Sequence, residues 1–282
     1  MPRSAATRRA YRSDWTAFAS WCARARRTAR PASASTVARY VDHLAAQRSV
    51  ATVRRRLAAV RAAHVDHGHA SPTDAAAVRL AVARAEWRQR DRATTTTPVR
   101  VPELRAMSQA LPATLAGTRD RAVLLLGYGA GLRPGELVRL DVGHVRRVRA
   151  GLRVDVGRRP VVVPFGSAVE LCAVDAWTRW RRAASVTDGP AFRAVDRHGR
   201  IDDGRLSVKA ITRIVRRAAD RAALDAARFR GSSLRRGTVV AATERGASDD
   251  GIMAHTRHRS RRLVRRYMAG SGAPAATPPA DR

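Results

Sequence analysis

The chain has 282 residues, of which 45% are hydrophobic, so it can bury a substantial core and is not a disordered polymer. Its 55 Lys and Arg residues exceed 23 acidic residues and give a net charge of +32, which indicates a polyanionic partner, with nucleic acid as the first candidate. Lys209 is the single lysine, so the charge is carried by arginine, whose planar guanidinium binds phosphate through two parallel hydrogen bonds.

Residues 1–91 are predicted to form a domain of four helices. The first helix has an apolar face with helical spacing. The residues of this face are Tyr11, Trp15, Phe18 and Cys22. Pro31 interrupts the pattern, and Ser35 is expected to cap the second helix. The third helix continues from about Val53 to His64, and the fourth from about Thr73 to Trp87.

Three consecutive arginines, Arg54, Arg55 and Arg56, lie between the apolar positions of the third helix. At 100° per residue they cover its outward flank. A solvated helix face is one interpretation, and contact with DNA is an equally good one given the net charge. We therefore treat the three as candidate DNA-binding residues of an N-terminal core-binding domain.

A linker is predicted at residues 92–101, where four consecutive threonines and a proline occur without a periodic apolar face. Residues 102–268 are expected to form the second domain. Residues 269–282 are small and rich in proline, so we expect a disordered tail.

The second domain is expected to be mainly helical with one small antiparallel sheet. Apolar and charged residues alternate between Gly143 and Phe165, which is typical of strands. Helical spacing predicts the other elements. These are Glu103–Leu111, Arg119–Tyr128, Gly131–Leu140, Val169–Ala183, Val208–Ala223, Leu234–Arg245 and Arg261–Met268. The predicted fold class is mainly α, of the α+β type.

Cysteine usage and hydropathy indicate a cytoplasmic protein. Cys22 and Cys172 are too few and too far apart for a disulfide framework or a zinc CxxC pair, which fits a reducing compartment. The longest apolar run, Ala122–Tyr128, is too short to cross a bilayer, so we expect no membrane contact.

Common motifs of other enzyme classes do not occur in the sequence. It contains no Walker phosphate loop, no GxSxG and no HExxH, so nucleotide hydrolysis and serine hydrolase or zinc protease chemistry have no support. His64, His67 and His69 are close together, but no cysteine or carboxylate pattern completes a site. We predict no metal site.

Three basic clusters in the second domain carry a resemblance. GAGLRPGEL contains Arg133, SSLR contains Arg235, and His258 lies nine residues before Tyr267. In this order, and with Tyr267 lying 32 positions after Arg235, the clusters resemble the tyrosine recombinase (phage integrase) family. The resemblance covers nearly the whole chain, because the N-terminal helices resemble the SAM-like core-binding domain of that family.

The resemblance implies a site-specific recombinase or integrase, a DNA-integration enzyme of mobile elements, that breaks and rejoins double-stranded DNA through a 3′-phosphotyrosine. Tyr267 would be the nucleophile, and Arg133 and Arg235 would stabilise charge on the phosphate. His258 would complete the set. Because the phosphotyrosine conserves the bond energy, no cofactor or metal is expected. A homotetramer on paired DNA sites is implied, while accessory proteins cannot be read from the sequence.

Two positions depart from the family pattern. Ser232 stands where the family has histidine, and a hydroxyl cannot exchange a proton near neutral pH. The turn of the predicted hairpin offers Arg158 or Arg159 where the family has lysine, and arginine is a poor general acid. Activity could therefore be weakened. The alternative is a catalytically impaired, recombinase-derived DNA-binding protein that acts as a regulator or is a relic.

Overall fold

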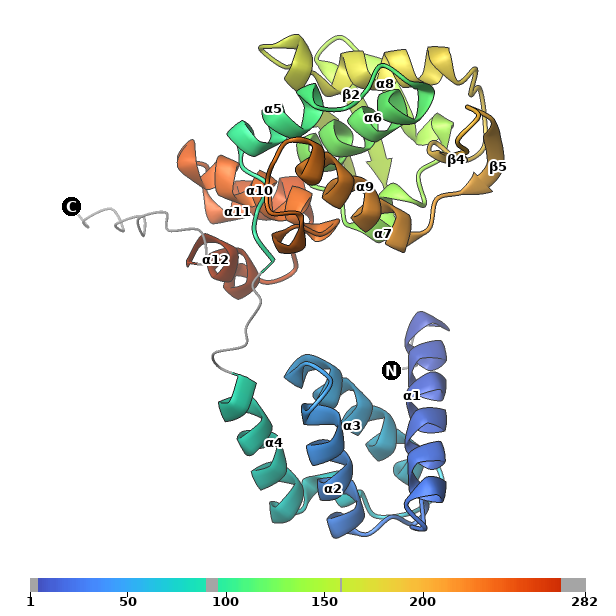
Figure 1. The fold of residues 1–282 in the computed structure, drawn as a ribbon. Coiled ribbons are helices and arrows are strands. Elements are labelled where there is room, and N and C mark those ends of the chain that lie inside the picture. Colours follow the sequence, from blue (N-terminus) through green and yellow to red (C-terminus); the bar gives the residue numbers. More distant parts are fainter. Residues whose placement is uncertain (1–4, 90–95, 158, 270–282) are drawn as a thin grey trace, which may run out of the picture. The chain divides into compact units, whose positions relative to one another are not determined.

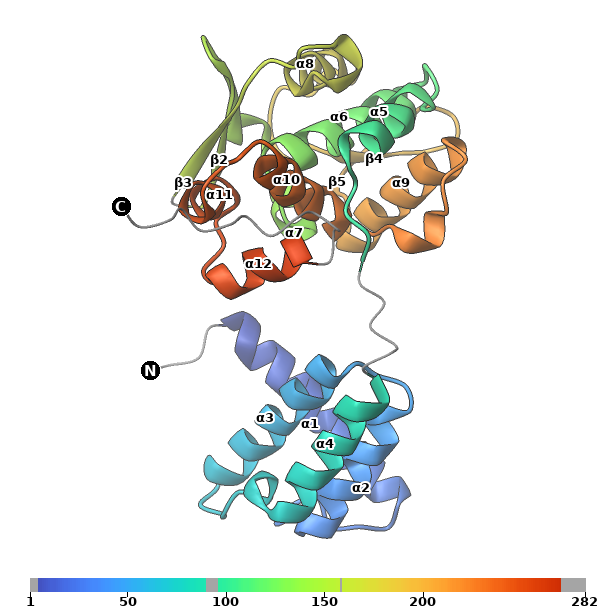
Figure 2. The ribbon, with the colours of Figure 1, turned by 90° about the vertical axis from the view of Figure 1, so that its left-hand side faces the viewer.

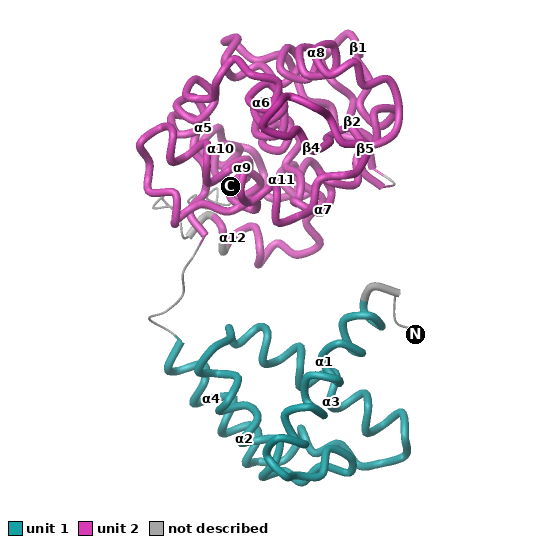
Figure 3. Tube along the Cα trace, turned by 45° about the vertical axis from the view of Figure 1, so that its right-hand side comes forward, with its two compact units in different colours: residues 1–94 teal, residues 95–282 magenta. Residues whose placement is uncertain are grey.

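A computed structural model describes residues 5–89, 96–157 and 159–269 (Figure 1). The chain divides into two compact units, residues 1–94 and 95–282, each with its own hydrophobic core (Figure 3). Residues 96–100 pack with the second unit, where the Val99 amide donates to the Ser233 carbonyl. Apart from Ala269, the predicted tail lies outside the described residues.

The first unit is helical. Its helices are α1 (Ala5–Arg24), α2 (Ala34–Ala45), α3 (Val50–Val65) and α4 (Ala76–Gln89), with a 3-10 turn at Pro72–Asp74 before α4. Each helix contributes apolar residues to one core, which includes Phe18 of α1, Tyr40 of α2, Val60 of α3 and Ala81 of α4. The four predicted helices are thus present, and α4 begins three residues later than expected.

The cap of α2 differs from the prediction. Ser33, not Ser35, is the N-cap: its backbone is extended and its side chain accepts from the Thr36 amide. Ser35 lies in the first helical turn, and its hydroxyl is 3.0 Å from that of Ser33. Both serines precede the apolar face at plausible distances, so the spacing alone did not distinguish them.

The second unit is mainly helical (Figures 1 and 2). Its helices are α5 (Val101–Gln109), α6 (Leu115–Gly129), α7 (Pro134–Leu137), α8 (Ala173–Ala183), α9 (Val208–Arg221), α10 (Ser232–Glu244), α11 (Asp249–Thr256) and α12 (Arg261–Ala269). Helices α10, α11 and α12 pack against one another. The predicted helix at Gly131–Leu140 shortens to the single turn of α7.

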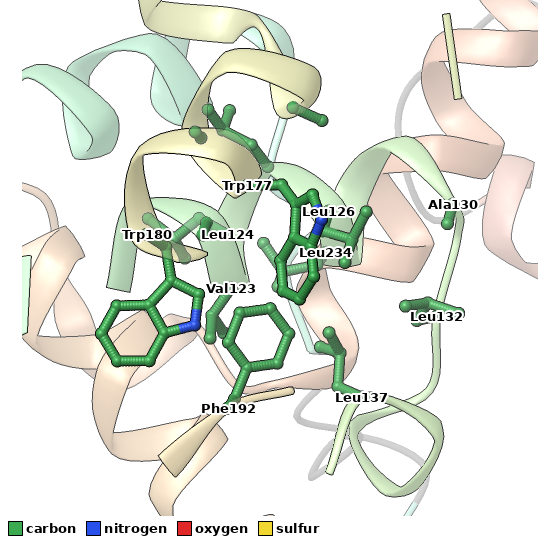
Figure 4. Close-up of a cluster of buried hydrophobic side chains, with 14 of the residues drawn as sticks. Val123, Leu124, Leu126, Ala130, Leu132, Leu137, Trp177, Trp180, Phe192 and Leu234 are labelled. Atoms are coloured by element: carbon green, nitrogen blue, oxygen red, sulfur yellow. The ribbon is translucent and has the colours of Figure 1, made fainter. Parts of the chain in front are cut away.

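Helix α6 runs through the core of this unit. Its residues Ala122–Leu126 are buried on every side, because α8, α9 and α10 all contact it. Figure 4 shows Trp177 and Trp180 of α8 and Phe192 packing around α6. The buried helix α6 fixes the start of the short loop that leads to α7. The fully buried side chains of Leu132, in the loop, and Leu137, in α7, hold the rest of it in place. This loop carries Arg133.

Two antiparallel sheets complete the unit. The first is the predicted sheet, with strands β1 (Val145–Val148), β2 (Gly151–Val156) and β3 (Arg159–Val163) paired in sequence order. The second is a hairpin of β4 (Arg193–Val195) and β5 (Ile201–Arg205), which the sequence did not predict. The mainly helical fold class with small antiparallel sheets is confirmed. Within the described residues, no helix is long and apolar enough to span a membrane.

Candidate active site

Four side chains from separate segments converge in the second unit. Arg133 precedes α7, Arg235 lies on α10, His258 follows α11 and Tyr267 lies on α12. The Arg235 Nε is 3.3 Å from the His258 Nε2, and the rings of His258 and Tyr267 meet edge to face with centroids 5.5 Å apart. A cavity of about 850 Å³ opens beside them. Its lining residues are Arg133, Glu136, Val156, Arg159, Met253, Arg257, His258 and Arg259.

Glu136 links the basic residues of the site. One carboxylate oxygen accepts from the Arg133 guanidinium at 2.7 Å, and the other accepts from the Arg133 amide at 2.7 Å and from Arg257 at 3.2 Å. The second oxygen is also 3.8 Å from the Arg235 Nη1. Burial alone would raise the pKa of Glu136, but the bonds from Arg133 and the charge of Arg257 outweigh it and lower that pKa. Glu136 is therefore ionised at neutral pH.

Arg235 is held rigidly inside the protein. Its side chain is only 4% exposed, and its Nη1 donates to the Gly131 carbonyl at 2.6 Å. Burial, together with the nearby Arg133 charge, lowers its pKa to about 10, so the guanidinium is still charged at neutral pH. Within the described residues its buried Nη2 has no hydrogen-bond acceptor. A buried, charged donor without a partner is an energetic cost that an anion would remove.

Gly131 makes this contact possible. Its φ of +54° lies in the left-handed region, and a Cβ there would meet the Thr256 Cγ2 at 3.0 Å. Only glycine takes up this backbone without strain. The turn directs the Gly131 carbonyl at Arg235 and sets Arg133 two residues further along the chain.

His258 is in its neutral form. Its Nδ1 is 2.5 Å from the Thr256 hydroxyl, which itself donates to the Ile252 carbonyl, so Nδ1 carries the proton. Nε2 then accepts from Arg235. Burial and the positive charges of Arg235 and Arg133 lower the pKa of His258 to about 4. The ring is thus a hydrogen-bond acceptor at neutral pH.

Tyr267 lies on an amphipathic helix whose Val264 is fully buried. The half-buried Tyr267 ring packs with Val264 on Val239 of α10, and the guanidinium carbon of Arg236 lies 4.8 Å from the ring centroid. Tyr267 thus packs on the apolar face of its helix, as an ordinary core residue would. The same packing brings its ring against His258.

The two departures from the family pattern lie in different places. Ser232 is the first residue of α10 and half-buried. The neighbouring Ser233 is fully buried, and its hydroxyl accepts from the Arg230 amide. Arg158 lies outside the described residues. Arg159 begins β3 and lines the cavity, so this strand borders the site.

Sequence reasoning assigned no role to Glu136 or Arg257. Glu136 was inside the quoted GAGLRPGEL motif, and its place three residues after Arg133 is the spacing of a helix capping box, which could have found it. Arg257 gave no such signal, because arginine is common throughout the chain. Its backbone is left-handed, with φ of 59°, which costs a non-glycine residue about 1–2 kcal/mol.

The three arginines of α3 have different environments. Arg54 and Arg55 are exposed and pair with Glu86 and Asp14. Arg56 is only 19% exposed and donates to the Tyr40 hydroxyl at 2.9 Å, so its predicted outward position is wrong. The physical reason is that its long side chain reaches back across α3 to an acceptor on α2.

The buried histidine near the end of α3, His64, has a structural role. The buried His64 accepts from the Ala32 amide through Nε2, and its Nδ1 is 2.8 Å from the Val60 carbonyl. Both ring nitrogens are occupied. Searching the described part of the chain finds no group of three or more His, Cys, Asp or Glu residues that could hold a metal ion.

Comparison with known families gives two matches. The phage integrase family model matches residues 98–272, and the model of the phage integrase N-terminal SAM-like domain matches residues 2–65. An integrase/recombinase xerD homolog from Selenomonas ruminantium is 29% identical over 275 residues, which cover 93% of this chain and 81% of the relative. Tyrosine recombinase XerC of Corynebacterium efficiens is 34% identical over 116 residues, covering 38% and 33% of the two chains.

Solved structures support the same fold. XerH site-specific recombinase bound to palindromic difH substrate aligns with a TM-score of 0.60 at 13% identity, covering 85% of this chain and 69% of that one. The Tn1549 transposon integrase in complex with transposon right end DNA aligns with a TM-score of 0.58 at 12% identity, covering 86% and 82%. At these identities the likeness concerns the fold alone.

Proposed function

This chain belongs to the phage integrase family, and on that premise we propose that it exchanges DNA strands at a specific site through a covalent 3′-phosphotyrosine at Tyr267. The observation that carries the proposal is the buried Nη2 of Arg235, which has no acceptor among the described residues. Arg235 contacts His258, which lines the cavity together with Arg133. A non-bridging phosphate oxygen is the acceptor that this donor set fits.

In the reaction, the Tyr267 oxygen attacks the phosphorus, and the bond from phosphorus to the 5′ oxygen breaks. The phosphate stays covalently bound to the enzyme, and attack by a 5′ hydroxyl reverses the step and releases the tyrosine. Negative charge grows on the non-bridging oxygens during attack, and Arg133 and Arg235 would stabilise it. The Gly131 carbonyl already fixes Arg235 for this role, and Glu136 holds Arg133 at the edge of the cavity before the phosphate binds.

Proton transfer is the weaker part of this site. The tyrosine must lose a proton and the 5′ oxygen must gain one. His258 is neutral and could accept a proton only at Nε2, which already accepts a hydrogen bond from Arg235, and its lowered pKa makes it a weak base. Ser232 can donate a hydrogen bond to the phosphate but cannot exchange a proton near neutral pH, and Arg158 or Arg159 would neutralise the departing oxygen without readily protonating it. We therefore expect slow cleavage.

The proposal implies one contact with DNA in the N-terminal unit and an assembly of several protomers. The N-terminal unit would bind duplex DNA through Arg54 and Arg55, and four protomers would assemble on two sites, because each active site cuts one strand. Such a protein would work in the cytoplasm, bound to the nucleoid. Binding should weaken steeply as salt rises, since each neutralised phosphate releases counterions.

The test is capture of the covalent intermediate. Wild-type protein, Tyr267→Phe and the matched control Tyr11→Phe are incubated with fragmented, nicked DNA from the source replicon and its flanks. SDS-stable, protease-sensitive adducts are expected with wild type and Tyr11→Phe only, and sequencing the trapped DNA would identify the site. Adducts of equal yield with Tyr267→Phe would refute the assignment of the nucleophile.

A second function is favoured by Ser232 and the hairpin arginines, which remove the two proton-transfer groups of the family pattern. The chain would then be a DNA-binding protein without strand transfer. Specific binding of the same DNA pool, with no adduct from wild type at any pH or incubation time, would select this alternative.

A further inference from the structure

We propose that Arg257 is a positioning residue that stays on Glu136 as its counter-charge, so that Arg133 is free to leave that carboxylate for the phosphate. This role deepens the proposed function and rests on it. The proposal explains why an arginine, and not a glycine, occupies a position whose backbone is left-handed.

The backbone of Arg257 is the first observation. It is the C-cap of α11, with φ of 59° and ψ of 37°, and its amide donates to the Met253 carbonyl. Side chains other than glycine rarely adopt this conformation. The fold accepts the strain immediately before His258, so interactions of the Arg257 side chain must offset it.

The side chain makes those interactions. Arg257 is only 10% exposed. Its Nη1 donates to the His255 carbonyl at 2.9 Å, and its Nη2 lies 3.2 Å from the Ala130 carbonyl, 3.1 Å from the Gly131 carbonyl and 3.2 Å from a Glu136 carboxylate oxygen. The guanidinium thus joins the end of α11 to the loop that carries Arg133.

Two of these acceptors are shared with the arginines of the site. The Gly131 carbonyl also accepts from Arg235, and Glu136 also accepts from Arg133. Three guanidinium groups therefore surround one carboxylate. Glu136 is the single acidic residue among the described residues that line the cavity. The three guanidinium groups carry two more positive charges than the one carboxylate can neutralise. These charges attract a phosphate only if Glu136 keeps a positive partner and so does not repel the phosphate.

Exposure distinguishes the two arginines bound to Glu136. Arg133 is 47% exposed and can turn toward a phosphate, whereas Arg257 is only 10% exposed and both of its terminal nitrogens already donate to acceptors. When Arg133 turns away, Glu136 would be a buried, unpaired carboxylate beside a second anion unless Arg257 remained on it. Such an unpaired buried charge is strongly unfavourable. Arg257 therefore permits the exchange of partners that phosphate binding requires.

The experiment measures anion binding and catalysis separately. The variants are Arg257→Gly, Glu136→Gln and the double variant, with Arg257→Lys as a charge-preserving substitution. Arg26→Gly is the matched control, because Arg26 also has a left-handed backbone, with φ of 51°, and is exposed. Inorganic sulfate is titrated against the ring resonances of His258 by NMR, and adduct formation on nicked DNA is followed in parallel.

Arg257→Gly is expected to weaken sulfate binding and slow adduct formation by at least about tenfold, because it leaves Glu136 without its counter-charge. Glycine relieves the backbone strain, so the loss would not come from that source. Arg257→Lys should stay within about threefold of wild type, since the charge remains. The double variant should return to within about twofold of Glu136→Gln alone, because a neutral amide needs no counter-charge.

The proposal is overturned if Arg257→Gly binds sulfate as tightly as Arg26→Gly does, or if the losses of the two single variants multiply in the double variant. If Arg257→Gly does not fold, Arg257→Lys decides the question. A tenfold loss of sulfate binding in Arg257→Lys would mean that the shape of the side chain matters and not its charge, which would overturn the proposal. Sulfate binding with the expected pattern but no adduct from wild type would count against the proposed function and leave the role of Arg257 supported.

Discussion

Arginines of the two units are paired in different ways. In the N-terminal unit Arg55 and Arg56 of α3 share the buried Asp14, whereas three other arginines of α3 and α4 each have a carboxylate of their own: Arg54 with Glu86, Arg61 with Asp74 and Arg84 with Asp42. The side chains of these three one-to-one pairs are largely exposed, so each pair contributes little to stability. In the second unit, Arg133, Arg235 and Arg257 surround the largely buried Glu136, and Arg235 and Arg257 are themselves largely buried.

The comparison shows why the number of arginines does not locate the site. An exposed arginine with its own carboxylate presents little uncompensated charge, whereas three partly buried guanidinium groups around one carboxylate create a strong local field. The lowered pKa values of Arg235 and His258 are consequences of that field and of burial. Substitutions of the arginines around Glu136 should therefore reduce adduct formation much more than substitutions of exposed, singly paired arginines.

The largest effect is expected from Arg235→Lys. Lysine keeps the charge but cannot supply the fork of donors that bonds Gly131 and faces the phosphate. Adduct formation should fall about 100- to 1,000-fold, the cost of losing one preorganised donor to a developing anion. The matched control, Arg54→Lys, should stay within about twofold because Arg54 has an exposed partner.

DNA affinity should be measured for both variants by fluorescence anisotropy, along with thermal unfolding. A loss in Arg235→Lys that affects binding as much as cleavage would mean that Arg235 contributes to uniform binding and not to the transition state. Equal losses in the two variants would remove the distinction between the paired and shared arginines.

Acid should destabilise the second unit through His258. Its pKa is about 4 in the folded protein and near 6.5 when unfolded, so the unfolded state binds the proton first as pH falls. The stability due to the neutral ring is complete above pH 6.5 and is lost between about pH 6.5 and 4, by about 3 kcal/mol. Urea unfolding of wild type and His258→Gln across this range checks the value, and the variant should show the shallower slope.

A smaller gain is expected from Ser232→His. An imidazole at this position could exchange a proton during cleavage, which the serine hydroxyl cannot do, and positioned proton transfer is worth about 100-fold or more when geometry is ideal. We expect an increase of about tenfold in adduct formation, because Ser232 is half-buried and the larger ring must displace its neighbours. Single-turnover cleavage checks this, with Ser233→His as a control that should disrupt the buried Ser233 contact.

Much of the fold follows from local sequence patterns. Helices α9 and α12 have strong apolar faces, and in β2 the alternation of Leu152, Arg153 and Val154 matches a buried, exposed and buried position. The β4–β5 hairpin was missed because IDDGR has one apolar residue and its strand pairing is irregular. Helix α11 was missed because its eight residues offer only two buried positions, Ile252 and Thr256.

The site was only partly predictable for a similar reason. Residues such as Tyr267 and Arg235 are marked by fixed spacing along the chain, whereas Arg257 reaches Glu136 across 121 positions of sequence. Nothing local distinguishes Arg257 from Arg259 or Arg261. Its role depends on the left-handed turn that directs the side chain inward, and that turn is set by tertiary packing.

The smallest effect is expected on the N-terminal side of the comparison. Phosphate must compete with Glu86 for Arg54 and with Asp14 for Arg55, so each substitution by alanine should lower the slope of log affinity against log salt by no more than about 1. Arg56→Ala should leave that slope unchanged and instead lower the free energy of unfolding by about 1 kcal/mol, because the Tyr40 hydroxyl loses its donor. A slope change in Arg56→Ala as large as in Arg54→Ala would show that DNA draws Arg56 out of the protein, and burial in the free chain would then no longer separate structural arginines from DNA-binding ones.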